Sequence, residues 1–362
     1  MKIGKINVVL MILISVIMCG CASYGPNRIS ADRFDYNAAI ANSQKVQILL
    51  NIVRLRYMDW PMFLNIEQVV SQYTFEQTGT AKAQVRLSNY NQLEAGWIGK
   101  YSERPVVMYK PMKGADYMRS MLTPISAGAM LGLVYTGWPS DQMFKTMVHS
   151  VNGHRNTQIE EGLQLQPDLS FAHFISVLRE YQRRDALEIR VTSNAVKSTR
   201  KEKISAQIVF HSDKVNASLK DDLDVVKKLM NLNLATNKYS VIWGAGSFDE
   251  NTIAIETRSV LQLMVELAAT VKVSPEDIAE GCVTKIRPRP KENLSGIKPL
   301  MEILSGKEPP KDAFVSCKYR DKWFWIEDTS LDSKKTFSYL TLLLTLGDTG
   351  GDAGAQMVIT TN

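Results

Sequence analysis

The chain has 362 residues, of which 45% are apolar and 22% charged, and its formal net charge is +6. These values are typical of globular proteins, so they exclude a disordered, collagen-like or coiled-coil chain as the main class. With four cysteines and four histidines, the chain offers few ligands for a multi-metal enzyme.

The first twenty residues have the pattern of a secretory signal. Lys2 and Lys5 form a basic start, and a mainly apolar run follows from Ile6 to Ile17. A helix of that length rises about 18 Å, which is too short for a hydrocarbon core of about 30 Å. The run therefore predicts a signal peptide over residues 1–20 that is cleaved from the mature protein.

The segment Met18-Cys19-Gly20-Cys21 resembles the lipobox of bacterial lipoproteins. Cys21 follows the small Gly20 whereas Cys19 follows the bulky Met18, so Cys21 is the expected lipid acceptor, although Met18 replaces the usual Leu. The resemblance implies a diacylglycerol and an amide-linked acyl chain such as palmitate on Cys21. Two or more acyl chains hold a protein firmly on a membrane without spanning it. The alternative is an ordinary cleaved signal with two incidental cysteines.

The residue after the lipidated cysteine indicates whether the lipid anchor lies in the inner or the outer membrane. In lipoproteins of Gram-negative bacteria an Asp at this position favours the inner membrane, and this chain has Ala22. The resemblance therefore implies a lipid anchor in the outer membrane, with the protein most simply on its periplasmic face. Residues 21–35, which are mainly polar and contain Gly25-Pro26, are expected to form the lipidated cysteine and a flexible tether.

Removal of residues 1–20 changes the charge and the cysteine count. Loss of Lys2 and Lys5 lowers the net charge from +6 to +4, which argues against nucleic-acid binding. Besides Cys21, only Cys282 and Cys317 remain. In an oxidising periplasm they either form a disulfide, which would stabilise the fold by about 3–4 kcal/mol, or stay as two free thiols. Their spacing does not suggest a zinc site.

The first half of the chain alternates helical and strand patterns. Apolar residues at helical spacing predict a helix over 40–57. Alternating, β-branched and aromatic residues then predict three short strands: Val69–Phe75, Ala83–Leu87 and Pro105–Tyr109. Three more helices are expected, at Met112–Met121, from Thr123 to Gly137 and from Ser140 to Val151.

The second half of the chain continues the mixture. Strands are expected on both sides of a polar loop at 193–203, at Tyr239–Trp243, at Thr252–Thr257 and in a hairpin formed by Ala313–Tyr319 and Trp323–Asp328. Helices are expected near 171–181, from Ser218, at Arg258–Val271, from Ser274 and at Ser333–Leu346, and the segment 283–312 is expected to be mostly loop. Without a regular βαβ order, the pattern predicts an α+β fold of short antiparallel strands and amphipathic helices, in one domain over 36–362 with an alternative boundary near 193–203.

Catalytic motifs are absent from the sequence. Gly244-Ala245-Gly246-Ser247 lacks the serine-hydrolase pattern and is expected to be a turn between strands. Asp348-Thr349-Gly350 occurs once, whereas aspartic-protease chemistry needs two carboxylates. His149 and His154 do not have the spacing of a helical zinc pair. We therefore predict no catalytic residue, cofactor or metal site.

Two groups of residues are candidates for binding. The charged or aromatic residues Arg54, Asp59, Trp60 and Arg258 can bind an anion or a partner, although structural pairing with carboxylates is the commoner role of such arginines. Trp323 and Trp325 lie on one face of the expected hairpin, with Phe324 and Ile326 on the other. Either this is a central strand, or one of its faces meets a partner or ligand.

Several body segments extend the resemblance beyond the lipobox. They are Phe34-Asp35-Tyr36-Asn37, Asn51-Ile52-Val53-Arg54-Leu55-Arg56-Tyr57, Thr257-Arg258-Ser259, Phe324-Trp325-Ile326-Glu327-Asp328 and Leu331-Asp332-Ser333-Lys334. They are similar to an uncharacterised group of proteobacterial lipoproteins over most of residues 33–346. The group implies no activity, ligand or catalytic residue.

Two hypotheses for the function follow. In the first, the protein is a structural or assembly component of the cell envelope that is held to the membrane by lipid and binds other envelope proteins. In the second, it is a lipid-tethered periplasmic enzyme or ligand-binding protein whose site assembles from dispersed residues. The residues considered for such a site are Arg54, Asp59, Glu256, Arg258 and Asp328. The sequence does not identify a small-molecule ligand or an oligomeric state.

Overall fold

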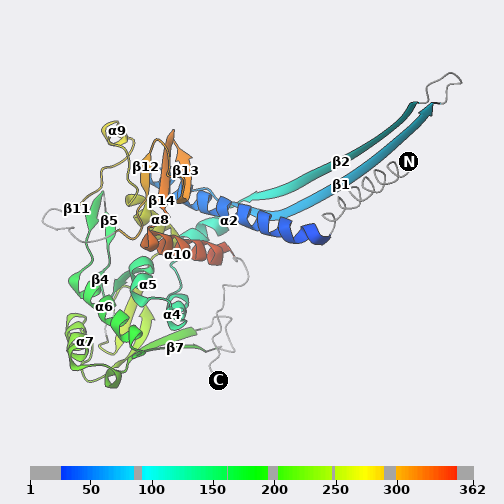
Figure 1. Cartoon of the computed structure of the whole chain (residues 1–362). Coiled ribbons are helices and arrows are strands. Elements are labelled where there is room, and N and C mark those ends of the chain that lie inside the picture. The colour runs from blue at the N-terminus through cyan, green and yellow to red at the C-terminus, as the bar shows by residue number, and fades with distance from the viewer. Residues whose placement is uncertain are drawn as a thin grey trace, which may run out of the picture. The chain divides into compact units, whose positions relative to one another are not determined.

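The computed structural model describes residues 26–84, 92–160, 162–194, 203–246, 249–288 and 299–348. Helices and mostly antiparallel strands are mixed along the chain, so the α+β prediction is confirmed (Figure 1). The predicted signal peptide and Cys21 lie outside the described residues. In the part of the chain that is described, no helix is long and apolar enough to cross a membrane.

The chain divides into two compact units, which we call the hairpin unit and the body. The hairpin unit comprises Met62–Met118, and the body comprises the residues before and after it. The alternative boundary near 193–203 falls inside the body, where the strands on its two sides pair with each other in one sheet.

A six-stranded sheet lies in the first half of the body, in the order β4-β3-β10-β9-β8-β7. Its strands are β3 (Val148–Val151), β4 (His154–Arg155), β7 (Leu187–Asn194), β8 (Lys203–Phe210), β9 (Lys238–Trp243) and β10 (Thr252–Thr257). All neighbours are antiparallel except β9 and β10, which run parallel. The segment after Trp243, expected to be a turn, therefore returns the chain to the start of a parallel neighbour.

Four helices accompany this sheet: α4 (Ala127–Tyr135), α5 (Ser140–Met147), α6 (Leu169–Arg183) and α7 (Ala217–Leu229). Helix α4 packs on β7, β8 and β10, and α6 packs on α5 and α7. The core between them contains buried aromatic side chains in edge-to-face pairs, such as Phe144 with Phe174 and Tyr181 with Phe210. A short 3-10 helix, η1 (Ser212–Lys214), precedes α7.

Helix α5 ends four residues earlier than predicted. Its pattern of buried residues continues through Val148 and Val151, but these two residues belong to β3 and pair with β10. Both are β-branched, and in a strand they are buried as completely as the helix would have buried them. Pairing with a strand about 100 residues away thus overrides the local helical pattern.

The second half of the body surrounds a three-stranded antiparallel sheet in the order β12-β14-β13. Its strands are β12 (Leu304–Gly306), β13 (Ala313–Tyr319) and β14 (Lys322–Glu327), and the helices beside it are α2 (Pro26–Arg56), α8 (Val260–Ala269), α9 (Pro275–Ala279) and α10 (Leu331–Asp348). The hairpin of β13 and β14 was predicted, and its turn residues Arg320 and Asp321 both have positive φ, as a two-residue hairpin turn requires. A small sheet joins β5 (Gln158–Glu160), β6 (Leu163–Leu165) and β11 (Arg287–Pro288), none of which was predicted.

Helix α2 is longer than the sequence indicated. The predicted helix over 40–57 is its C-terminal half, where Ile48, Leu49, Ile52 and Val53 are buried and the helix packs on β13 and α8. The residues from Pro26 to 35, which were expected in a flexible tether, are helical. Proline suits the first turn of a helix, and neither glycine nor proline follows it before Arg56.

The hairpin unit contains β1 (Leu64–Gln84) and β2 (Gln92–Pro111), followed by the start of α3 (Ala115–Leu122). The two strands form a continuous antiparallel ladder from Leu64–Pro111 to Gln84–Gln92, with one irregularity between Ile66 and Gln68. The predicted strands Val69–Phe75 and Pro105–Tyr109 lie inside β1 and β2, so both are strands but were predicted too short, and the predicted strand Ala83–Leu87 extends past Gln84 outside the described residues. Each strand spans about 65 Å at 3.3 Å per residue, far more than the usual five or six residues provide.

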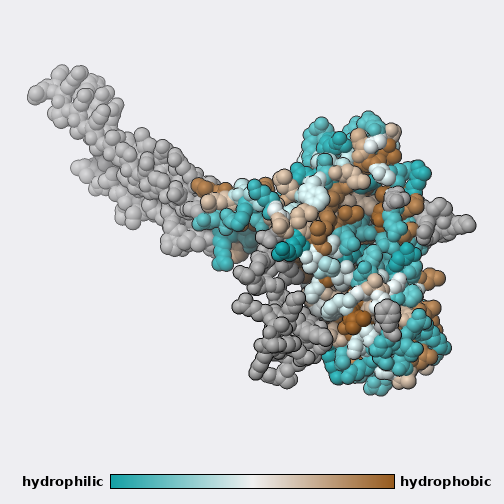
Figure 2. Space-filling model, turned by 180° about the vertical axis from the view of Figure 1, so that it is seen from behind, coloured by the Kyte–Doolittle hydropathy of each residue, from teal (hydrophilic) through white to brown (hydrophobic). Residues whose placement is uncertain are grey.

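On the face shown in Figure 2, small hydrophobic patches alternate with hydrophilic residues over the described part of the body. Single exposed apolar residues of this kind, such as Leu169 and Val265, are normal on soluble surfaces.

Candidate functional site

A pocket of about 640 Å³ lies in the body among α5, α6, α8 and the small sheet. Its lining residues come from α5, the segment 156–167 with β5 and β6, α6, α8 with the residues after it, and the segment 299–302. Its volume falls in the range of small-molecule sites. The apolar part of the lining includes Phe171 and Ile175 of α6, so the helix that fills the core also forms one wall.

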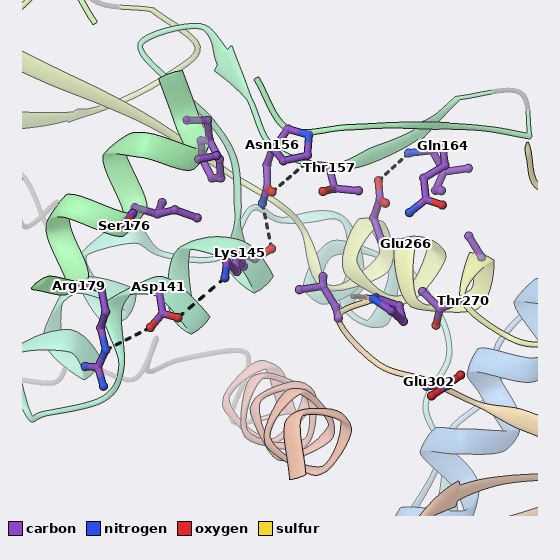
Figure 3. Close-up of a pocket in the computed structure, with 18 of the residues that line it drawn as sticks. Asp141, Lys145, Asn156, Thr157, Gln164, Ser176, Arg179, Glu266, Thr270 and Glu302 are labelled. Atoms are coloured by element: carbon purple, nitrogen blue, oxygen red, sulfur yellow. Dashed lines mark hydrogen bonds and ion pairs between the residues drawn. The ribbon is translucent and has the colours of Figure 1, made fainter. Parts of the chain in front are cut away.

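The charged side chains of one end of the pocket pair with each other. Asp141 of α5 forms ion pairs on both sides: Lys145 Nζ lies 3.9 Å from its Oδ2, and Arg179 Nε lies 3.4 Å from its Oδ1 (Figure 3). Arg179 also donates to Gln182 Oε1 at 2.7 Å. These side chains are partly exposed, so the pairs can exchange with charged groups of a ligand at small cost.

The wall formed by α8 carries a carboxyl group in an apolar setting. Glu266 points from α8 toward β5, where its Oε1 accepts the Ile159 N–H at 3.1 Å (Figure 3). Burial raises the pKa of Glu266 above its usual value, and the nearby Arg258 and this N–H oppose the rise without cancelling it. A carboxyl group with a raised pKa in a pocket is a common feature of binding and catalytic sites. Farther along, Lys272 forms an ion pair with Glu302.

Arg258, a candidate from the sequence, is a core residue. It is 1% exposed, and its guanidinium donates to the carbonyl oxygens of Lys145 at 3.0 Å and Thr146 at 3.2 Å, and also to that of Thr157. Burial lowers its pKa, and the charge of Glu266 partly restores it. Arg258 thus joins the end of α5 to the segment before β5, and it supports the pocket from behind without lining it.

The other dispersed residues do not meet in one place. Asp59 accepts the Tyr319 hydroxyl, Glu256 accepts the Ser150 hydroxyl at 2.8 Å, and Asp328 pairs with Lys334 at 2.7 Å. Arg54 is half-buried at the end of α2, and Trp60 is 56% exposed. None of these residues lines the pocket. The specific site that the second hypothesis drew from them is therefore not assembled.

Trp323 and Trp325 lie on the central strand of their sheet. Phe324 and Ile326 are fully buried, while both tryptophans are half-buried, so the alternation predicted for this strand is confirmed. A Cβ atom at Gly306 of β12 would lie 3.1 Å from the Trp325 ring, which shows how closely the strands pack around it. Core packing explains β14.

Cys282 and Cys317 are free thiols. Cys317 is buried in β13, and burial raises its pKa to about 12. Cys282 is half-buried just after α9, and its Sγ lies 4.0 Å from Glu280. Of the two alternatives from the sequence, the structure has the unbonded one.

A polar cluster joins the residue after α2 to α9 and β14, and no pattern in the sequence indicates it. Asp277 of α9 accepts the Tyr57 hydroxyl at 2.7 Å, Lys322 Nζ at 2.8 Å and the Ser274 hydroxyl at 3.0 Å. Burial alone would raise the pKa of Asp277, but these three donors outweigh it and hold the pKa below its usual value. Asp277 also lies within 4.8 Å of Glu280 and Cys282. Because its carboxylate already binds a lysine and a tyrosine, we assign no metal to this group.

The hairpin unit offers a second candidate, an interface. β1 and β2 pair only with each other among the described strands, so each has a described neighbour on one side only. The outer edge of a long strand is a template for pairing with another chain. Comparisons of the chain with protein-family models, with curated proteins and with solved structures find no match, so none of them assigns a function to either candidate.

Proposed function

We propose that this protein is a lipid-anchored component of the bacterial outer membrane, on its periplasmic face, that binds other envelope proteins and acts in assembly rather than catalysis. The hairpin unit is the observation that carries the proposal. Two long strands form a sheet that has no third described strand.

A two-stranded sheet is marginally stable by itself in water, and usually a third strand or a packed helix stabilises it. A ribbon with about 20 residues per strand makes physical sense when something else completes it. Addition of a strand to an exposed edge is a common way in which proteins bind extended segments, because the backbone supplies the affinity. We therefore place the binding function on β1 and β2.

The N-terminal segment supports the anchoring part of the proposal. Cys21 follows Gly20 directly after the short apolar run, and Ala22 stands where Asp would favour the inner membrane. In membrane fractionation, Cys21→Ser should release the protein to the soluble fraction, and Cys19→Ser, the matched control, should leave it on the membrane. Ala22→Asp should move it to the inner membrane. Continued membrane retention of Cys21→Ser would contradict the lipid anchor.

Binding is tested by crosslinking in intact envelopes followed by purification under denaturing conditions. The wild-type protein should recover one reproducible envelope protein. Thr78→Pro, which removes a backbone donor in the middle of β1, should lose it. Glu266→Gln in the pocket should retain it. Recovery of no partner by the wild-type protein would refute the proposal, and loss of the partner in Glu266→Gln would move the binding site to the body.

The pocket favours a second candidate function, binding of a small ligand with a cationic group. Glu266 is the specific observation, since a half-buried carboxyl group that lines the pocket without a direct ion-pair partner among the described residues would gain most from such a group. Native mass spectrometry of protein purified from envelopes should then detect a bound small molecule that Glu266→Gln lacks. Equal ligand content in both proteins would exclude Glu266 as its binding group.

A further inference from the structure

The two prolines of β2 establish which backbone groups of the hairpin face outward. Proline has no N–H, so within a ladder it occupies positions whose N–H would point away from the neighbouring strand. Pro105 and Pro111 both have odd numbers, and both lie in the ladder with β1. The next residue, Met112, has an even number, and its N–H donates inward to the Phe63 carbonyl at 2.9 Å. Odd-numbered residues of β2 therefore have outward backbone groups.

The same parity holds for β1. From Gln68 to Gln84, odd residues of β1 stand opposite odd residues of β2, for example Gln77 opposite Gly99. In an antiparallel pair, directly opposite residues either exchange both hydrogen bonds with each other or both direct their groups outward. From Gln68 to Gln84 the outer edge of β1 is thus built from the odd-numbered residues, as is the outer edge of β2, whereas before the irregularity at Ile66/Gln68 the parity of β1 is reversed.

The even-numbered and odd-numbered positions of the two strands also differ in composition. Between 72 and 84 and between 92 and 104, the even positions are polar apart from Gly96 and Ile98, and the register sets Glu76 opposite Lys100 and Lys82 opposite Glu94. The odd positions are apolar or small apart from Gln77 and Glu103, and they include Tyr73, Phe75, Trp97 and Tyr101. Because residues of one parity share a face of a strand, the backbone register assigns the mainly polar positions to one face of the ribbon and the mainly apolar or small positions to the other.

These features match a second copy of the same chain. If the outer edge of β2 in one copy pairs with the outer edge of β1 in the next, the strands continue to alternate in direction. Odd residues then meet odd residues, so the apolar positions stay on one face and the polar positions on the other across the boundary. The two edges have nearly the same length, 21 and 20 residues. This contact gives the backbone groups on both outer edges of every inner copy hydrogen-bond partners. Pairing of β1 with β1 would instead leave the outer edge of β2 unpaired in both copies.

We propose that copies of this protein associate through the hairpin, with the outer edge of β1 pairing antiparallel with the outer edge of β2 of the next copy. The inference rests on the proposed function, because it identifies a second copy of the chain as a binding partner of β1 and β2. The contact is head-to-tail, so the particle grows by one hairpin per copy until it closes.

Edge-specific proline variants test the arrangement. Gln77→Pro blocks the β1 edge, Gly99→Pro blocks the β2 edge, and both positions have the parity at which Pro105 is already accommodated. Light scattering after size exclusion of the lipidated full-length protein in detergent gives the number of chains per particle. We expect several copies for the wild type and one copy for each variant alone. A mixture of the two variants should form a two-copy particle, because each retains the edge that the other lacks.

Thr78→Pro is the control for the hairpin itself, because its N–H faces β2. It should lose the inner ladder and should associate with neither variant. Residue-resolved hydrogen exchange should show the inner ladder intact in Gln77→Pro and Gly99→Pro. In the wild type it should show protected amides at odd as well as even positions, and this measurement needs no substitution.

Two results would overturn the inference. One is a wild-type protein that contains one chain per particle and exchanges its odd-position amides freely. The other is a Gly99→Pro variant that still dimerises by itself, which would mean that β1 pairs with β1. If crosslinking nevertheless recovers another envelope protein that Thr78→Pro loses, only the self-association fails and the proposed binding function stands.

Discussion

The buried Arg258 provides the sharpest quantitative test of the body. Its guanidinium is 1% exposed and donates to three carbonyl oxygens, of Lys145, Thr146 and Thr157. Hydrogen bonds from a charged donor contribute about 1.5–3 kcal/mol each, but removing the guanidinium from water offsets a large part of their sum. Replacing one member of such a buried network typically costs about 3–5 kcal/mol.

We therefore expect Arg258→Leu to lower the free energy of unfolding by about 3–5 kcal/mol, because three buried acceptors lose their donor. Arg258→Lys retains the charge, but an ammonium cannot reproduce the planar fork that reaches all three carbonyls, so it should cost about 2–3 kcal/mol. Arg183→Leu is the matched control, since that side chain is 63% exposed and, among the residues that the structure describes, pairs with Glu180 alone, and it should change stability by less than about 0.5 kcal/mol.

The assay is urea unfolding of the lipid-free mature protein, with tryptophan fluorescence as the signal. A loss of less than about 1 kcal/mol for Arg258→Leu would mean that water or rearranged backbone satisfies the carbonyls. The account of Arg258 as the support behind the pocket would then be wrong.

Three other predictions concern the thiols, the Asp277 cluster and one glycine. A thiol reagent should label Cys282 but not the buried Cys317 in the native lipid-free protein and both in urea, whereas a disulfide would leave both unlabelled. Asp277→Asn should lower the melting temperature most near neutral pH. Because the folded pKa of Asp277 is depressed, its contribution is present above its unfolded pKa of about 3.9 and is lost as pH falls through the folded value, so the two melting curves should converge in acid. A gap that is unchanged down to pH 2 would contradict this. Gly162→Ala should cost about 2–3 kcal/mol and Gly281→Ala about 1 kcal/mol, because both have positive φ but only at Gly162 would the new Cβ lie 2.9 Å from Thr284; equal losses would show that the contact relaxes.

Elements with strong local signals could be predicted from the sequence. The hairpin of β13 and β14 has alternating apolar residues on both sides of a polar turn, and α6 has its apolar residues at helical spacing. In both cases the local pattern agrees with the packing, so nothing distant overrides it. The strand β3 shows the opposite case, because only its pairing with β10 distinguishes it from the end of a helix.

The pocket and the long hairpin could not be predicted. Asp141, Arg179 and Glu266 are ordinary polar residues on three different helices, and only the tertiary fold brings them together. In the hairpin, Gly79, Gly96 and Gly99 interrupt the alternation that marks a strand, so the sequence suggests short pieces. Arg258 is a binding candidate from the sequence, with pairing to carboxylates as the commoner role, but its guanidinium donates to backbone carbonyls about 100 residues away, which leave no trace in side-chain patterns.

Because α2 is long and helical, a deletion within it would change both the distance and the direction of the proposed lipid anchor relative to the body. Four residues separate the proposed lipid site, Cys21, from the start of the helix, and the first buried residue is Ile48. From Pro26 to Gln47 the helix rises about 33 Å, so on the proposed anchor it would act as a stiff spacer between lipid and body. Removing seven residues from the part between 33 and 46 would shorten the helix by about 10 Å. Seven residues make nearly two full turns, so the lipid would keep its original direction about the helix axis, relative to the body, to within about 20°. Removing five would turn that direction by about 140°, so two deletions of similar size would present different sides of the body to the same membrane.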